Sequence, residues 1–316
     1  MQWVAALLSE LGIGPSGAGQ HEAKAFPDGA AFRIEIPSVE GPRVLEAVLN
    51  AAEAEGITVN RVSQGSGAGL LRASELRAMA QAGHDAGVEV CLFIGPRERY
   101  GIGAHPRSSD GSAQGDQVRG TRQLGYALED VLRATEQGIR SFLVADLGLL
   151  VALRKAQERG DLPEGIVWKV SAAMAPSNPL TLKLLERLGG STLTVNVPSD
   201  VTIGELAEMR AAISVPIDLY VESPDALGGI VRGNEVGDLI VAGAPLRQVR
   251  AAQRGAGLPE RPPPGSGRRR QLRREGAPGR DRARVAGAPV PRPGAVQAGR
   301  GRPRHPRCRV IRTGAR

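Results

Sequence analysis

Strand-like and helix-like segments alternate along residues 32–246, repeating about every 25 residues, which is the pattern of a parallel sheet with helical crossovers. The strand-like runs begin at residues 32, 57, 88, 141, 166, 193 and 216. The helix-like runs lie at 43–55, 70–86, 121–137, 147–159, 178–188 and 202–213, with a weaker one at 226–235. This alternation restricts the chain to an α/β fold.

Two α/β architectures fit this order, a closed barrel and a doubly wound open sheet. The number of strands approaches eight, and polar residues recur inside several of them, as they do when strand ends line one shared mouth. Ile166–Pro176 (IVWKVSAAMAP) is an example, because Lys169 interrupts a run that would be apolar in an ordinary parallel strand. We interpret Lys169 as pointing into the mouth, and the sequence favours a (β/α)8 TIM-barrel-like fold.

The charge divides the chain into two unlike parts. Residues 247–316 contain 20 Arg, no Lys and 3 acidic residues, a net of 20 − 3 = +17, so the first 246 residues carry 8 − 17 = −9. We therefore expect an N-terminal helical segment and linker at 1–30, a TIM-barrel-like domain at 31–246, and a disordered Arg/Gly/Pro/Ala-rich tail at 247–316.

The composition of the tail has two interpretations. It is either a basic arm that binds nucleic acid non-specifically through phosphates, or the product of a shifted reading frame. The frameshift interpretation is based on the genetic code. The codons of residues 246–253, read one nucleotide later, are compatible with a strand that would close the barrel. In the chain as given, the eighth strand is then missing or corrupted, unless VAGAP at 241–245 supplies it. An open seam would expose backbone groups and make the protein poorly soluble.

Several features bear on the compartment and on bound groups. No apolar run reaches about 18 residues, so no membrane span is expected, and the start lacks the pattern of a signal peptide. Cys91 and Cys308 are the two cysteines, too far apart in sequence for a metal-binding spacing. We expect a cytoplasmic protein with no cofactor and no metal site.

The candidate catalytic residues come from the strands and their ends, because side chains two apart on a strand share a face. Acid–base chemistry requires carboxylates, a lysine or a phenol with suitable pKa values. The candidates are Glu35, Asp146, Lys169, Asn196 and Glu222, with Ser171 on the face of Lys169. The alternative is a structural ion network of Arg33, Glu35 and Lys169, which we favour for Arg33.

The candidate substrate-binding residues lie mainly on loops. Ser63–Gly67 is a glycine-rich turn whose amides either hold an anion or form an ordinary turn, and the long connection 95–120 is rich in arginine. Arginines near a mouth suit an anionic substrate or RNA, and the alternative is a solvated, mobile loop without such a role. The candidates are Ser66, Arg97, His105, Arg119 and Tyr220.

Five segments in order, FRIEIPSVEGP, VADLGLL, WKVSAAMAPSNP, VNVPSD and DLYVESPDALGG, resemble peptidase family U32, the collagenase-like proteins. The resemblance covers residues 32–246 and implies a TIM-barrel-like catalytic domain and peptide hydrolysis. The family's signature cysteines are missing from DLYVESPDALGGIVRG. The iron–sulfur cluster of relatives that modify RNA bases or quinone precursors therefore has no ligand set in this chain.

The resemblance and the candidate residues together predict a hydrolase or peptidase that acts on a small-molecule, peptide or anionic substrate at the C-terminal face of the barrel. Two alternatives remain open at the level of sequence. One is a non-catalytic module that binds an anion or RNA. The other is an inactive, frameshifted product.

Overall fold

The computed structural model describes residues 2–13, 25–98, 101–108 and 111–250. The strands are β1 Phe32–Pro37, β2 Arg61–Gln64, β3 Glu89–Phe93, β4 Ser141–Val144, β5 Val167–Val170, β6 Leu193–Val197, β7 Ile217–Glu222 and β8 Leu246–Arg250. The α-helices are α1 Gln2–Glu10, α2 Pro42–Ala54, α3 Ala73–Ala86, α4 Gly120–Glu136, α5 Leu147–Glu158, α6 Pro179–Gly189, α7 Ile203–Ala212 and α8 Val236–Gly243.

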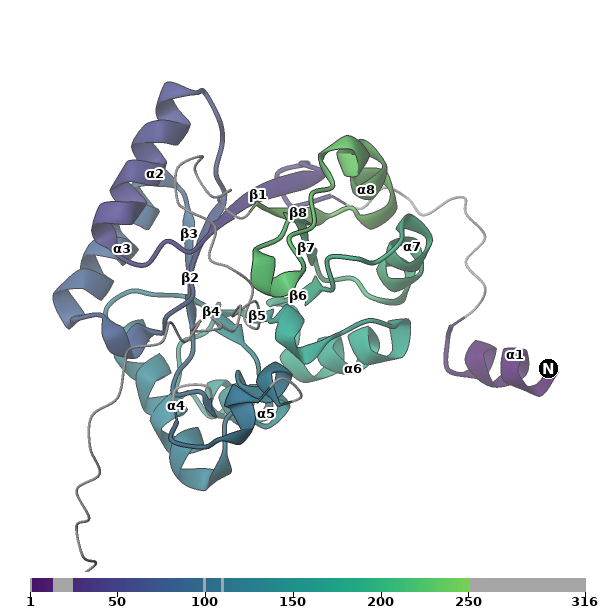
Figure 1. Ribbon diagram of the computed structural model, residues 1–316, viewed down its shortest axis with the longest axis horizontal. Helices are drawn as coiled ribbons and strands as arrows, with labels where there is room; N and C mark the ends of the chain where they lie inside the picture. The colour runs from purple at the N-terminus through teal and green to yellow at the C-terminus, as the bar shows by residue number, and fades with distance from the viewer. Residues whose placement is uncertain (1, 14–24, 99–100, 109–110, 251–316) are drawn as a thin grey trace, which may run out of the picture. The chain divides into compact units, whose positions relative to one another are not determined.

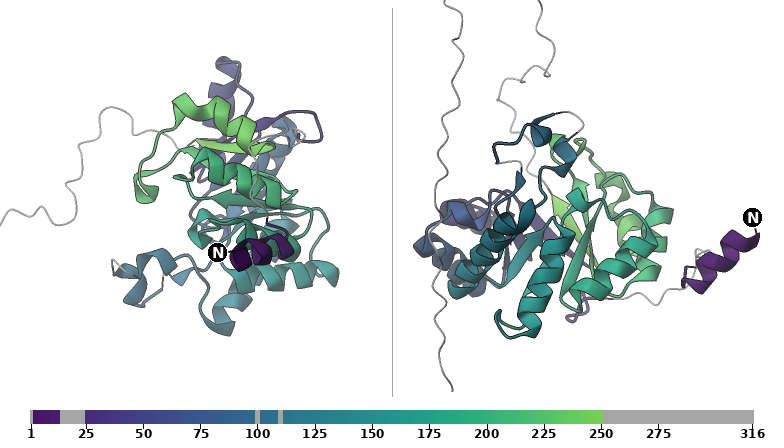
Figure 2. Two further views of the ribbon diagram at one scale, coloured as in Figure 1. Left: turned by 90° about the vertical axis from the view of Figure 1, so that its right-hand side faces the viewer. Right: turned by 90° about the horizontal axis from the view of Figure 1, so that it is seen from below.

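The strands form a closed parallel barrel in sequence order, with β1 next to both β2 and β8. Helices α2 to α8 lie around the outside of this ring (Figure 1), and the view from below shows the strands inside the helices (Figure 2). The fold is a (β/α)8 TIM barrel, as the alternation of segments predicted. The C-terminal strand ends of such a barrel share one mouth.

The eighth strand corrects the expectation of an open seam. The residues at 241–245 include the last turn of α8 and a cis peptide bond before Pro245, and β8 follows at Leu246–Arg250. Strand β8 pairs with β1 from Phe32↔Leu246 to Glu35↔Val249, and with β7 along most of its length. The chain as encoded therefore closes the ring, and its last strand extends past the domain boundary that composition predicts at residue 246.

Local signals explain most of the helices. Pro42 occupies the first turn of α2, and Asn178 caps α6 by accepting a hydrogen bond from the backbone N–H of Thr181. Thr202 and Glu205 form the capping box of α7. The weak helix predicted at 226–235 is wrong, because that segment contains 3₁₀ turns at Asp225–Leu227 and Gly233–Glu235 and the helix begins only at Val236.

The apolar core lies between the strands and the helices. Trp168 on β5 is fully buried and stacks on Phe142 of β4, with ring centroids 5.9 Å apart. The outward face of each strand supplies the apolar side chains of this layer, which leaves the inward face for other residues. Within the described ranges, no helix is both long and apolar enough to cross a bilayer.

Candidate functional site

The interior of the barrel holds a cluster of charged side chains in place of an apolar core. Lys169 and Glu35 face each other across the ring, with 2.5 Å between Lys169 Nζ and Glu35 Oε1, and the ammonium lies 3.7 Å from Asp218 Oδ2. Arg61 donates from Nη1 to Glu35 Oε2 at 3.1 Å and to Asp218 Oδ2 at 2.7 Å. All four residues are at most 1% exposed.

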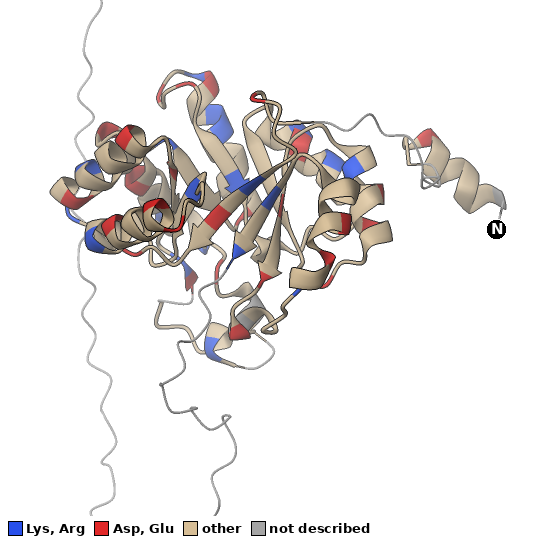
Figure 3. Ribbon diagram, turned by 90° about the horizontal axis from the view of Figure 1, so that it is seen from above, with Lys and Arg blue, Asp and Glu red and all other residues tan. Residues whose placement is uncertain are grey.

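Two further residues extend the cluster toward the N-terminal ends of the strands. Arg61 Nε donates to Glu89 Oε1 at 2.7 Å, and Arg247 on β8 donates to Asp218 Oδ1 at 3.0 Å. We call these six residues the lumen network: Glu35, Arg61, Glu89, Lys169, Asp218 and Arg247. It contains three carboxylates and three cations, so it is electrically balanced. Figure 3 shows acidic and basic bands on the barrel strands.

Neutral hydroxyl groups complete the hydrogen bonding of the carboxylates. Ser63 donates to Glu35 at 2.6 Å, Thr194 to Asp218 at 2.7 Å and Ser141 to Glu89 at 2.6 Å. Buried charges are tolerated only when they are paired and hydrogen-bonded. Each charge of the lumen network is paired with an opposite charge, while Arg61 Nη2 and Arg247 Nε have no hydrogen-bond partner among the described residues.

The pKa values of the network favour the charged forms. Burial acts to raise the pKa of Glu35, but the charges of Lys169 and Arg61 outweigh it and the pKa is lowered. Burial likewise acts to lower the pKa of Lys169, but Glu35 and Asp218 outweigh it and the pKa is raised. The carboxylates therefore favour the ammonium form of Lys169 over the neutral amine that Schiff-base chemistry requires.

The structure thus brings Glu35 and Lys169 together as an ion pair, in line with the structural interpretation of the two residues. Arg33 is not part of the network. Its guanidinium pairs with Asp28 at 3.0 Å and lies over the ring of Phe26, which corrects its predicted place in the network.

Tyr220 lies on β7 two residues after Asp218, toward the mouth of the barrel. It is only partly buried, and within the described part of the chain its hydroxyl group has no hydrogen-bond partner. Burial raises the pKa of Tyr220, while the ammonium of Lys169 acts in the opposite direction. The phenol therefore stays protonated at neutral pH and can donate to an oxygen atom placed in the mouth.

Glu222 and Asn196 also lie near the C-terminal strand ends. Glu222 accepts a hydrogen bond from Arg250 at 2.9 Å, and its side chain is 23% exposed, so its carboxylate is reached by solvent. Asn196 is buried beside Asp218, and its amide group, in the orientation that satisfies it, donates to the backbone carbonyls of Asp218 and Val197. Asn196 therefore supports the strands. Glu222 is partly exposed and paired with Arg250, and the register of β7 against β8 shifts between Tyr220 and Glu222.

Asp146 and Ser171 serve as caps. Asp146 accepts from the backbone N–H groups of Leu149 and Val118, which holds the start of α5 and the end of the long connection. Ser171 accepts from the backbone N–H of Ala173 at the turn after β5. The structure therefore gives Asp146 a capping role, and its catalytic role stays a prediction.

The glycine-rich turn after β2 does present its amides to an anion, but the anion is part of the protein. The backbone N–H groups of Gly65 and Ser66 donate to the carboxylate of Glu40 at 3.0 and 3.1 Å. Arg97 lies behind this turn and donates to the carbonyl oxygens of Gly65 and Ser66. Ser66 and Arg97 therefore do come together, but in the packing of two loops.

The other predicted loop residues are engaged elsewhere. Arg119 pairs with Glu98 at 3.0 Å, and the ring of His105 contacts the side-chain oxygen of Gln114 at 3.3 Å. Neither residue contacts the lumen network in the described ranges. Cys91 is fully buried inside the barrel, and burial raises the pKa of its thiol to about 12, so it is a poor nucleophile.

Four members of the lumen network were not predicted from the sequence: Arg61, Glu89, Asp218 and Arg247. Asp218 could have been predicted from the sequence, because it lies two residues before Tyr220 and therefore shares its face of the strand. Arg61 and Glu89 begin their strands, where an exposed position is the usual assumption. Arg247 was assigned to the tail on composition.

The sequence was also compared with known proteins. No family model matches it, and no curated protein matches it. Solved structures match in fold: the protein CutC from Streptococcus agalactiae (15% identity, 69% of this chain and 97% of that chain, TM-score 0.47), a U32 peptidase (14%, 76% and 98%, 0.44) and the YdjI aldolase from Escherichia coli K12 (18%, 70% and 75%, 0.46). These structures differ in activity, and at such identities the likeness is one of fold alone.

Proposed function

We propose that the protein is a hydrolase that cleaves an amide bond at the C-terminal mouth of the barrel, with Tyr220 as the hydrogen-bond donor to the carbonyl oxygen and Glu222 as the general base. The observation that carries the proposal is the Tyr220 hydroxyl group, which is partly exposed and without a partner among the described residues. Active sites of TIM barrels lie at this end of the strands.

The roles follow from the chemistry of the two groups. Tyr220 donates a hydrogen bond to the carbonyl oxygen of the substrate, while the Glu222 carboxylate takes a proton from water as its oxygen attacks the carbonyl carbon. The C–N bond then breaks, and the proton held by Glu222 passes to the leaving nitrogen. The lumen network lies below and keeps a fixed ammonium, that of Lys169, near the phenol.

Peptides are the substrate class that we propose, because the sequence resembles the collagenase-like peptidases in five segments. Binding of an anion or RNA by the long loop has less support. Arg97 and Arg119 are already engaged by carbonyl groups and a carboxylate. The basic tail lies outside the described residues.

The test is cleavage of a mixed peptide library by the full-length protein, with new termini identified by mass spectrometry. Tyr220→Phe and Glu222→Gln should each lower kcat/KM by about 100-fold, the usual contribution of a hydrogen-bond donor to the carbonyl oxygen or of a general base. Glu208→Gln is the matched control, because Glu208 is an exposed carboxylate on α7. Equal cleavage by wild type and both mouth variants would refute the assignment, and absence of cleavage by the wild type would refute peptide hydrolysis.

A further inference from the structure

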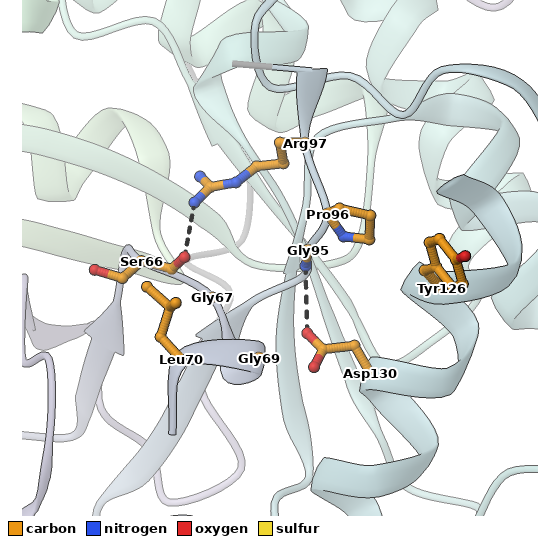
Figure 4. Close-up of a pocket in the computed structure, with 9 residues that line it drawn as sticks. All are labelled: Ser66, Gly67, Gly69, Leu70, Gly95, Pro96, Arg97, Tyr126 and Asp130. Carbon is orange, nitrogen blue, oxygen red and sulfur yellow. Dashed lines mark hydrogen bonds between the residues drawn. The ribbon is translucent and has the colours of Figure 1, made fainter. Parts of the chain in front are cut away.

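A cavity of about 510 Å³ lies beside the barrel, and neither Tyr220 nor Lys169 lines it. Its walls come from the turn after β2, which includes the 3₁₀ turn Ala68–Leu70, from the start of the long connection after β3, and from α4. Figure 4 shows Tyr126 and Asp130 on α4, across from Leu70 and Gly69. The volume falls in the range of small-molecule sites.

Asp130 is the acidic group of this cavity, and it forms an ion pair with Arg133 on its own helix. Its side chain is 10% exposed. The backbone N–H of Gly95 donates to Oδ2 at 3.4 Å, Arg133 approaches Oδ1 at 3.3 Å, and the backbone of Gly69 also hydrogen-bonds to the carboxylate. The contacts from Gly95 and Arg133 are long, whereas Asp218 in the lumen network has two partners at 2.7 Å. Burial is the largest influence on Asp130 and raises its pKa.

Two glycines leave this carboxylate accessible. A Cβ atom at Gly69 would lie 3.6 Å from Asp130 Oδ1, and one at Gly95 would lie 3.9 Å from Oδ2. A methyl group at either position would therefore contact the carboxylate and cover it. With glycine at both, a ligand atom can occupy that space.

The rest of the cavity is apolar. Leu70 is 75% exposed, and Tyr126 is 49% exposed on the opposite side, with Pro96 between the two loops. Arg97 is the basic residue of the lining, but its guanidinium lies 3.8 Å from the Phe93 ring centroid and donates to backbone carbonyls. The cavity thus offers a carboxylate and an apolar wall to a ligand.

We propose that this cavity binds a small organic amine, whose ammonium group hydrogen-bonds to Asp130 and whose aromatic or branched body lies between Leu70 and Tyr126. An ammonium supplies the short charge-assisted hydrogen bond that Asp130 lacks. The body covers two exposed apolar side chains, which removes their surface from water. The site is independent of the amide hydrolysis proposed for the mouth.

The test uses the full-length protein and three probes with the same ring: 2-phenylethylamine, the neutral 2-phenylethanol and the anionic phenylacetate. Ligand-observed NMR titration measures the Kd of each. We expect the amine to bind at least about tenfold more tightly than the alcohol, the difference of one charge-assisted hydrogen bond. Equal binding of amine and alcohol, preference for phenylacetate, or no binding of the amine would each overturn the proposal.

Variants locate the binding. Asp130→Asn removes the charge, and Gly69→Ala fills the space next to it without requiring a positive φ; each should weaken binding of the amine by about tenfold or more. Glu129→Gln is the matched control, because it removes an exposed carboxylate from the adjacent position of α4. Unchanged affinity in Asp130→Asn would overturn the site. The three-probe comparison on the wild-type protein decides the question of charge even if a variant does not fold.

Discussion

Lys169 and Glu35 are separated by 134 positions in the sequence, yet 2.5 Å separates the ammonium nitrogen from a carboxylate oxygen at the centre of the barrel. Both residues are fully buried. The pair links β5 to β1 across the lumen, so it holds opposite walls of the ring together. The free energy of unfolding of the barrel therefore depends on both charges being present.

Removing both charges of this pair should cost less than the sum of the two single removals. We expect Lys169→Met and Glu35→Gln each to lower the free energy of unfolding by about 3–5 kcal/mol, because each leaves a buried charge without its partner. The double variant should lose less than the sum of the two. Urea denaturation measures all three. Lys155→Met, at an exposed lysine of α5, is the control and should change stability by under about 0.5 kcal/mol; additive losses would contradict the pairing.

Stability should fall on both sides of neutral pH. The folded pKa of Glu35 lies below its ordinary value of 4.5, so its contribution is present above that pH and is lost as the pH falls through the folded pKa. The folded pKa of Lys169 lies above its ordinary value of 10.5, so its contribution is present below that pH and is lost as the pH rises through the folded pKa. Chemical denaturation across pH tests this, and the acid limb should be shallower in Glu35→Gln.

Two helical glycines should respond to alanine in opposite directions. At Gly83 in α3 a Cβ atom would lie 2.6 Å from Val90 Cγ2 and 2.7 Å from the backbone oxygen of Val88, so Gly83→Ala should destabilise by about 1–3 kcal/mol. At Gly125 in α4 nothing lies within 4 Å, so Gly125→Ala should stabilise by about 0.5–1 kcal/mol. Thermal unfolding followed by circular dichroism compares them. Similar melting temperatures would count against the close packing of α3 on β3.

Strand β8 should be required for folding. A chain ending at residue 258 keeps all eight strands and should unfold cooperatively, whereas a chain ending at residue 245 lacks β8 and exposes the edges of β1 and β7. Analytical ultracentrifugation and thermal unfolding measure the difference. Cooperative unfolding of the shorter chain would show that closure by β8 is dispensable.

The frameshift interpretation of the tail stays a prediction, because residues 251–316 lie outside the described part of the chain. Independent reads of the nucleotide sequence across codons 244–262 test it. An intact reading frame in those reads would remove the interpretation.

Much of the architecture was predictable because it depends on local signals. The alternation of strand and helix, the capping box at Thr202 and Glu205, and the Asn178-Pro179 start of α6 each specify an element without long-range information. The weak helix at 226–235 was misplaced because the apolar residues that bury α8, such as Leu239, begin after Val236. The eighth strand was missed because it is rich in arginine and its two apolar residues, Leu246 and Val249, are three positions apart and so give no period-two pattern.

The interior of the barrel was harder to predict than its outline. The face alternation correctly turned Glu35 and Lys169 inward, but it could not say that Arg61 and Asp218 would neutralise them. Pairing across a ring depends on the register of strands far apart in sequence. Asp146 shows the opposite problem, since an aspartate after a strand fits a helix cap as well as an active site.

Through Arg247, strand β8 contributes a buried ion pair to the barrel in addition to its backbone pairing. Arg247 supplies one of the cations around Asp218. Strand β8 is also the last of the eight barrel strands to be synthesised. Until those residues are synthesised, the nascent domain has both an unpaired pair of edges and an excess of negative charge at its centre. Because β8 is synthesised after the other barrel strands, the barrel can close only when its five residues are present. Those residues then pair the open strand edges and balance the charge around Asp218.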